Sequence, residues 1–99
     1  MGEALARLGY PYIGSDQKIA GGAPIIVGTR VTVRAIAGYY QIGMTVDEIL
    51  TALPHLTPAQ VHSALAYYFD HQAEVEADLA AASDVDYWKK QALDPSRQS

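Results

Sequence analysis

Cysteine is absent from the 99-residue sequence, which excludes disulfide bonds and thiolate metal sites. No apolar run approaches the roughly 20 residues that a membrane helix needs, so we expect no membrane segment. The N-terminus lacks a basic start followed by an apolar block, which argues against a signal peptide. These absences favour a cytoplasmic protein with a single domain over residues 1–99, small enough for dimerisation to help its stability.

Side chains suited to catalysis or metal binding are also scarce. His55, His62 and His71 include no pair at i and i+4, and no carboxylate completes a set of three ligands, so we expect no metal. Asp47 and Glu48 are adjacent and diverge on a helix, which argues against an acid–base pair. No serine has a base nearby in the sequence. We therefore expect a protein that is not an enzyme and carries no cofactor.

Positive charge is in short supply, since seven Lys and Arg residues face eleven Asp and Glu residues, for a net charge of −4. Residues 1–46 carry four cations and two acids, a balance of +2, and residues 47–99 carry three cations and nine acids, a balance of −6. The net charge argues against nucleic acid as a partner. The uneven distribution nevertheless allows a first half that faces DNA.

Two helix-start signals organise the middle of the chain. Thr45 stands three residues before Glu48, and Thr57 stands three residues before Gln60, so both pairs match the capping box. Gly43 suits the left-handed position that ends a helix before the first of these starts. The sequence therefore predicts helices over residues 33–42 and 46–53 and a third from residue 58 onward.

The apolar residues of these three segments repeat at i, i+3, i+4 and i+7, which is the spacing of one buried helix face. The three stripes are Val33, Ile36, Ala37 and Tyr40, then Val46, Ile49, Leu50 and Leu53, then Val61, Ala64, Leu65 and Tyr68. We predict a mainly α fold with a trihelical, helix-turn-helix or winged-helix-like core over residues 31–71. Such units often place their last helix against DNA, but many serve only in protein interactions.

The flanking segments predict less structure. We expect a loose start over residues 1–9, and short strands with turns over residues 10–30 that form a β-hairpin. Helix-forming residues predict a C-terminal helix over residues 72–92, which is either continuous with the third helix or broken near His71. We expect residues 93–99 to be disordered.

The candidate DNA contacts lie around the start of the first helix and on the third. Arginine can pair with phosphate or with a guanine edge, and threonine can donate to phosphate. The third helix offers polar side chains but no Lys or Arg on its exposed positions. The alternative is that the arginines are solvated surface charges. The candidates are Arg30, Thr32, Arg34, Lys18, Gln60 and Ser63.

The aromatic residues exceed what one stripe per helix can bury. We place Tyr39, Tyr67 and Phe69 in a dimer interface, where aromatic side chains are enriched, with a locally wide core as the alternative. Tyr87 and Trp88 stand in a polar segment and suit an anchor for a partner protein. The alternative for Trp88 is that it folds back onto the helices.

Several runs resemble the domain of unknown function 433 family, in order from about Tyr12 to His71. The runs are Gly-Gly-x-Pro at 21–24, Gly-Thr-Arg-Val-Thr-Val at 28–33, Gly-Met-Thr-x-Asp-Glu-Ile-Leu at 43–50, Pro-His-Leu-Thr at 54–57 and Ala-Leu-Ala-Tyr-Tyr at 64–68. Gly28, Thr29, Arg30 and Thr32 sit on the family motif.

The resemblance implies a small prokaryotic protein with a winged or trihelical helix-turn-helix core. Family members look like the antitoxin half of VapBC-like toxin–antitoxin pairs, beside a PIN-like nuclease toxin. On that basis our first hypothesis is a homodimeric antitoxin-like protein that binds operator DNA and a PIN-like toxin. The second is a protein-interaction and dimerisation module without DNA binding, which suits the negative net charge and the cation-free third helix.

Overall fold

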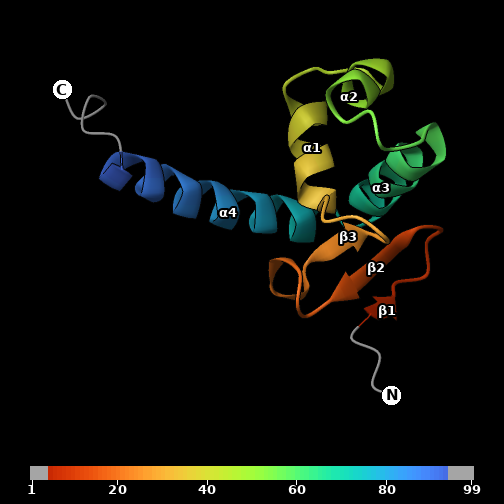
Figure 1. The fold of residues 1–99 in the computed structure, drawn as a ribbon, viewed down its shortest axis with the longest axis horizontal. Helices are drawn as coiled ribbons and strands as arrows, with labels where there is room; N and C mark the ends of the chain where they lie inside the picture. The colour runs from red at the N-terminus through yellow and green to blue at the C-terminus, as the bar shows by residue number, and fades with distance from the viewer. Residues whose placement is uncertain (1–4, 94–99) are drawn as a thin grey trace.

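The structure, a computed structural model, describes the backbone of residues 5–93 and the side chains of residues 5–82. A small antiparallel sheet occupies one end of the body, three short helices pack beside it, and a long fourth helix extends away (Figure 1). Within the described chain, no helix combines the length and hydrophobicity needed to cross a bilayer. The elements are β1 (Leu5–Arg7), β2 (Ile13–Asp16), the 3-10 turn η1 (Ala20–Gly22), β3 (Pro24–Ile26), α1 (Val33–Gln41), α2 (Val46–Ala52), α3 (Pro58–Asp70) and α4 (Gln72–Leu93).

The sheet has the strand order β1-β2-β3 and contains one strand more than the predicted hairpin. Residues 5–7 pair antiparallel with β2, with Leu5 opposite Asp16 and Arg7 opposite Gly14, so the predicted loose start is wrong for this segment. Gly14 permits the pairing because a Cβ there would lie 2.7 Å from the carbonyl oxygen of Ala6. Strand β3 pairs with the other edge of β2 and places Ile26 opposite Ile13.

The helix starts follow the predicted caps. The hydroxyl oxygens of Thr45 and Thr57 accept hydrogen bonds from the backbone N–H groups of Glu48 and Gln60, and both capping boxes are complete. Helix α1 ends before Gly43, whose φ of +93° is the left-handed conformation that glycine adopts without a Cβ penalty. The mainly α prediction is confirmed, and the observed helix bounds lie close to the predicted ones.

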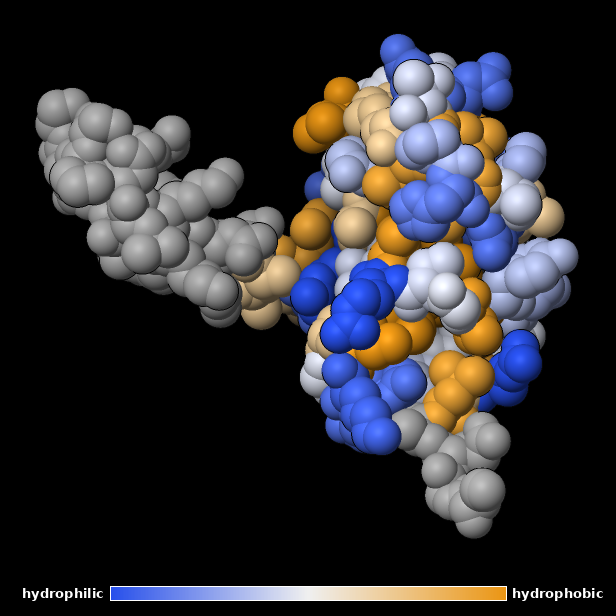
Figure 2. Space-filling view, viewed as in Figure 1, coloured by the Kyte–Doolittle hydropathy of each residue, from blue (hydrophilic) through white to orange (hydrophobic). Residues whose placement is uncertain are grey.

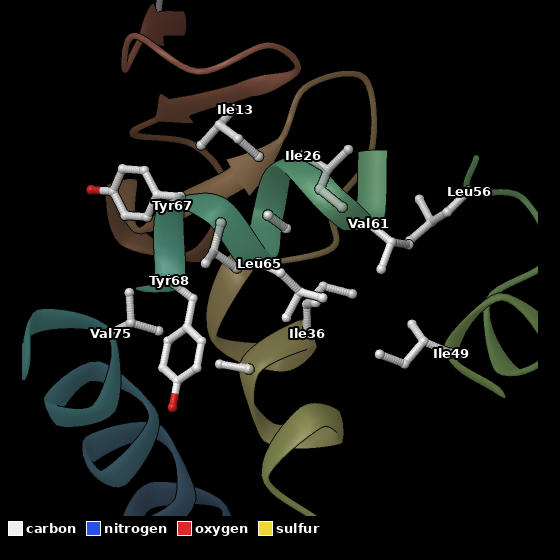
Figure 3. Packing of buried hydrophobic residues seen from close by; sticks show 13 residues of the cluster. Ile13, Ile26, Ile36, Ile49, Leu56, Val61, Leu65, Tyr67, Tyr68 and Val75 are labelled. Carbon is white, nitrogen blue, oxygen red and sulfur yellow. The ribbon is translucent and has the colours of Figure 1, made fainter. Parts of the chain in front are cut away.

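The core lies where the sheet, α1, α2 and α3 meet. Figure 3 shows side chains from all of these elements pointing toward one another, and Val75 of α4 closing one side. Eight of its members are fully shielded from solvent. These are Ile13, Ile26, Val33, Ile36, Ala37, Ile49, Val61 and Ala64. The apolar stripes predicted on the three helices therefore pack on one another and on the inner face of the sheet, except at Tyr40, which is exposed.

Helix α4 is separated from α3 by a single residue. His71 has φ −133° and ψ 43°, which turns the chain and lets α4 cross α1. The α4 side chain of Val75 is buried, and Leu79 lies against Gly38 of α1. Beyond these first turns the helix leaves the body (Figure 1). Of the two possibilities that the sequence left open, the structure shows the broken helix.

Candidate interaction surfaces

The C-terminal end of α1 and the last turn of α3 expose large apolar side chains. Tyr40 is 45% exposed, Phe69 is 46% exposed, and Ile42, just after α1, is 76% exposed. The rings of Tyr40 and Phe69 meet edge to face, with centroids 5.2 Å apart. We call Tyr40, Ile42 and Phe69 the aromatic face. Figure 2 shows hydrophobic side chains reaching the surface of the body between hydrophilic ones. Grouped exposed apolar side chains often mark interaction sites.

The predicted dimer-interface residues separate into three environments. Phe69 belongs to the aromatic face. Tyr39 is partly buried and packs against the core. Tyr67 is only 6% exposed, and its hydroxyl donates to Glu74 over 3.1 Å, so its ring belongs to the core of the single chain. The sequence could not separate these cases because the carboxylate partner of Tyr67 comes from the next helix.

Tyr67 is also the centre of an aromatic cluster beside the α3–α4 junction. Its ring stacks on His71 with centroids 4.2 Å apart, and Tyr10 meets it edge-on at 5.2 Å. The hydroxyl of Tyr10 donates to Asp70. Burial, followed by the hydrogen bond to Glu74, raises the pKa of Tyr67 to about 12. The hydrogen bond to Asp70 is the main cause that raises the pKa of Tyr10.

Carboxylates in the first turns of α4 bind side chains of α1 and α3. Glu74 accepts from Tyr67, Glu76 accepts from the Tyr68 hydroxyl over 2.7 Å, and Asp78 forms an ion pair with Arg34 at 3.2 Å. These carboxylates thus attach the first turns of α4 to the body. Together with Val75 and Leu79, we call Glu74, Glu76 and Asp78 the α4 attachment.

The attachment changes the assignment of one predicted DNA contact. The guanidinium of Arg34 points to Asp78. One of its nitrogens lies 3.2 and 3.3 Å from the two carboxylate oxygens of Asp78. Thr32 is 8% exposed, and its hydroxyl oxygen caps α1 by accepting from the N–H of Ala35. Both residues therefore have structural partners within the chain.

The two candidate DNA contacts on α3 also form hydrogen bonds within the chain. The side chain of Gln60 accepts from the N–H of Thr57, and the hydroxyl of Ser63 donates to the carbonyl of Pro11 in the β1–β2 turn. Arg30 and Lys18 remain exposed, in turns on the sheet side of the molecule. The structure therefore does not bring the six candidates together on one surface.

The α2–α3 pair presents no positive charge. The sequence contains no Lys or Arg between Ala35 and Trp88. The exposed positions of α3 include Ala59, His62 and Ala66, and α2 exposes Asp47 and Glu48. Phosphate binding depends on Lys and Arg side chains that replace condensed counterions. This surface is therefore poorly suited to a DNA backbone.

An open cavity of about 370 Å³ lies between the glycine-rich turn, the start of α1 and α4. Its walls include Gly21, Gly22, Arg34, Glu74 and Asp78. Arg34 and Asp78 bind each other, and Glu74 binds Tyr67, so the charged side chains of this wall already have partners within the chain. Within the described part of the chain, no three His, Asp or Glu side chains gather as a metal site. The predicted partner anchors, Tyr87 and Trp88, lie outside the residues whose side chains the structure describes.

Comparison with known proteins gives two findings. The family model described as "Protein of unknown function (DUF433)" matches residues 13–68. A crystal structure of a DUF433 member protein from Anabaena variabilis is similar to this chain, with a TM-score of 0.65 and 28% sequence identity. The similarity covers 70% of this chain and 68% of that one. No curated protein matches the sequence.

Proposed function

The chain belongs to the DUF433 family, and from that premise we propose that it is a protein-interaction module that docks a partner protein on its aromatic face. The observation that carries the proposal is the exposure of Tyr40, Ile42 and Phe69 on a small domain. Rings that already pack edge to face are fixed in position before a partner arrives. Aromatic side chains held in this way are typical anchors of protein interfaces.

Charge supports this choice over DNA reading by α3. We assign the trihelical part to the helix-turn-helix class, with α2 and α3 as the paired helices. A recognition helix in that class needs nearby cations for phosphates and polar side chains for bases. The exposed side chains of α3 are uncharged or acidic, and its two polar candidates, Gln60 and Ser63, hold local structure. We therefore expect no operator reading through α3.

The partner class follows from the same surfaces. An apolar, cation-free face favours a partner with an apolar surface of its own. In the antitoxin-like interpretation the partner is a PIN-like toxin, and the part of α4 that leaves the body supports this, because an extended helix is a common way to fill a groove of another protein (Figure 1).

DNA binding through the sheet end is the second candidate. It is supported by Arg7, Lys18 and Arg30, which are all exposed and all lie before α1. About six neutralised phosphates per dimer would give a log–log salt slope of about −5. This binding would be largely independent of sequence, because contacts to phosphate position a protein without reading bases.

The test measures both kinds of binding with two matched sets of variants. Tagged chain is expressed with the product of the gene next to its own, and the amount that co-purifies is compared for Phe69→Asn and for the control His62→Asn on the exposed side of α3. We expect Phe69→Asn to weaken the complex at least about thirtyfold, as for an aromatic anchor worth about 2 kcal/mol, and His62→Asn to leave it unchanged.

Fluorescence anisotropy with the upstream DNA and a scrambled duplex, at two salt concentrations, covers the second candidate. The interaction-module proposal expects weak binding that is equal for both duplexes. Tight, salt-dependent binding to both duplexes that is lost in Lys18→Ala with Arg30→Ala, and kept in Phe69→Asn, would overturn it in favour of DNA binding through the sheet end.

A further inference from the structure

The break between α3 and α4 has no local cause in the sequence. From Ala59 to Asp94 the chain contains neither glycine nor proline, the residues that usually end a helix. The residues at the break are Asp70, His71 and Gln72, and strong helix formers follow them. Local preference therefore favours one continuous helix, in conflict with the bent arrangement that the structure shows.

The backbone at the break is already close to a continuous helix. The N–H of His71 donates to the carbonyl of Tyr67 over 3.0 Å, and the carbonyl of His71 accepts from Val75 over 2.9 Å. Both are the i to i−4 hydrogen bonds of an α-helix. To make the helix continuous, His71 must take helical dihedral angles. The N–H groups of Gln72, Ala73 and Glu74 must then donate to the carbonyls four residues earlier. The hinge is thus one residue long.

Tertiary contacts hold the bend in place. The α4 attachment binds Tyr67 and Tyr68 of α3, and Arg34 and Gly38 of α1, through hydrogen bonds, an ion pair and apolar contact. All of these partners belong to the body and none to α4 itself. A second copy of the chain presents the same partners in the same arrangement. The attachment can therefore form equally well between two chains.

We propose that two copies of the chain exchange α4. His71 straightens, residues 58–93 become one helix about 54 Å long, and the α4 attachment of each chain docks on α1 and α3 of the other. The occupant of the docking surface is thus α4 of a second copy. The proposal does not use the aromatic face, so it stands or falls independently of the proposed function.

The free-energy difference between the closed and the exchanged forms comes from the hinge and from the association of two chains. The contacts of α4 with the body are the same in two closed chains and in an exchanged pair, so they cancel. The pair gains helical hydrogen bonds across each junction and loses the stacking of His71 on Tyr67. Pairing also costs the translational and rotational entropy of one molecule, so the fraction of chains in the exchanged form rises with protein concentration.

Engineered cysteines test the exchange directly, because the chain has no cysteine of its own. A Cβ added at Gly38 would lie 3.6 Å from Cδ1 of Leu79. Chains carrying Gly38→Cys are mixed with chains carrying Leu79→Cys at high concentration, incubated and oxidised. The control mixture pairs Gly38→Cys with Ala59→Cys, on the exposed side of α3. We expect a disulfide between chains in the first mixture and only background cross-linking in the control.

Hinge variants supply a second measurement on the chain without cysteine. His71→Ala and His71→Gly both remove the imidazole, but alanine favours a helix and glycine does not. Because the residue is helical only in the exchanged form and each pair has two hinges, His71→Ala should dimerise about thirtyfold more tightly than His71→Gly. Sedimentation equilibrium measures both constants, and circular dichroism checks that both variants fold.

Four results would overturn the proposal. The first is equal cross-linking in the two mixtures, which means random collision. The second is a chain that stays monomeric at every concentration while the double variant Gly38→Cys with Leu79→Cys forms its disulfide within one chain. The third is equal dimerisation of the alanine and glycine variants. Loss of dimerisation in Phe69→Asn alone would point to a dimer through the aromatic face and would also overturn it.

Discussion

The raised pKa of Tyr67 predicts that the protein loses stability in alkaline solution. The pKa of the Tyr67 phenol is about 12 in the folded chain, above its ordinary value of 10.0, because burial and the hydrogen bond to Glu74 disfavour the phenolate. A group whose pKa is raised by folding stabilises the folded state fully below its unfolded pKa. The stabilisation should therefore be complete below pH 10 and fall away as the pH rises toward 12.

The size of the effect follows from the shift. About two pKa units correspond to about 2.7 kcal/mol, which is a substantial part of the stability of a domain this small. Tyr10 acts in the same direction, since the hydrogen bond to Asp70 also raises its pKa. We expect the free energy of unfolding of the unmodified chain to fall by about 2 kcal/mol between about pH 8 and about pH 11.5.

Urea denaturation followed by circular dichroism at the two pH values measures this fall. Tyr67→Phe should cost about 1 kcal/mol at the lower pH, from the lost hydrogen bond, and should remove most of the alkaline decrease. Tyr12→Phe is the matched control, because that side chain is 45% exposed, and it should keep the decrease. If Tyr67→Phe declines with pH as steeply as the unmodified chain, the assignment of the effect to Tyr67 is refuted.

Two further predictions concern the sheet and a helix cap. Gly14→Ala should destabilise the fold by about 1–3 kcal/mol, because the new Cβ would lie 2.7 Å from the carbonyl oxygen of Ala6. It should also lower the hydrogen-exchange protection of residues 5–7. Unchanged protection would contradict the tight β1–β2 pairing. Thr57→Ala should lower the melting temperature by about 4–8 °C, because the helix cap contributes about 1 kcal/mol of stability. Thr51→Ala, on the exposed side of α2, should change the melting temperature little. Equal shifts in the two variants would contradict the role of the cap.

The predictable parts of the fold are those with local causes. The caps at Thr45 and Thr57 depend on residues three positions away, so the sequence displays them directly and the structure shows both. Strand β1 cannot be read from the sequence, because three residues are too few for a visible alternation and their partner is β2. The sequence also does not decide the bend at His71, because no local residue causes it; contacts from α1 and α3 impose it.

The candidate surfaces followed the same rule. Exposure of Phe69 agrees with the expectation that some aromatic residues exceed what the core can hold. The burial of Tyr67 and the pairing of Arg34 were beyond the sequence, because their partners, Glu74 and Asp78, come from a helix whose direction depends on the bend. Arg34 and Asp78 are 44 positions apart, so no motif of short spacing could have joined them.

The cation-free stretch from Ala35 to Trp88 also determines how proteolysis and covalent modification can act on this protein. Trypsin-like proteases cut after Lys or Arg, so they can release the segment from residue 35 to residue 89 only in one piece, with α2 and α3 intact. Enzymes that acetylate or ubiquitinate lysine side chains have only Lys18, Lys89 and Lys90 to act on. Modification of lysine is therefore confined to Lys18, before α1, and to Lys89 and Lys90 near the end of α4, and cleavage after Lys or Arg has no site between Arg34, in the first turn of α1, and Lys89.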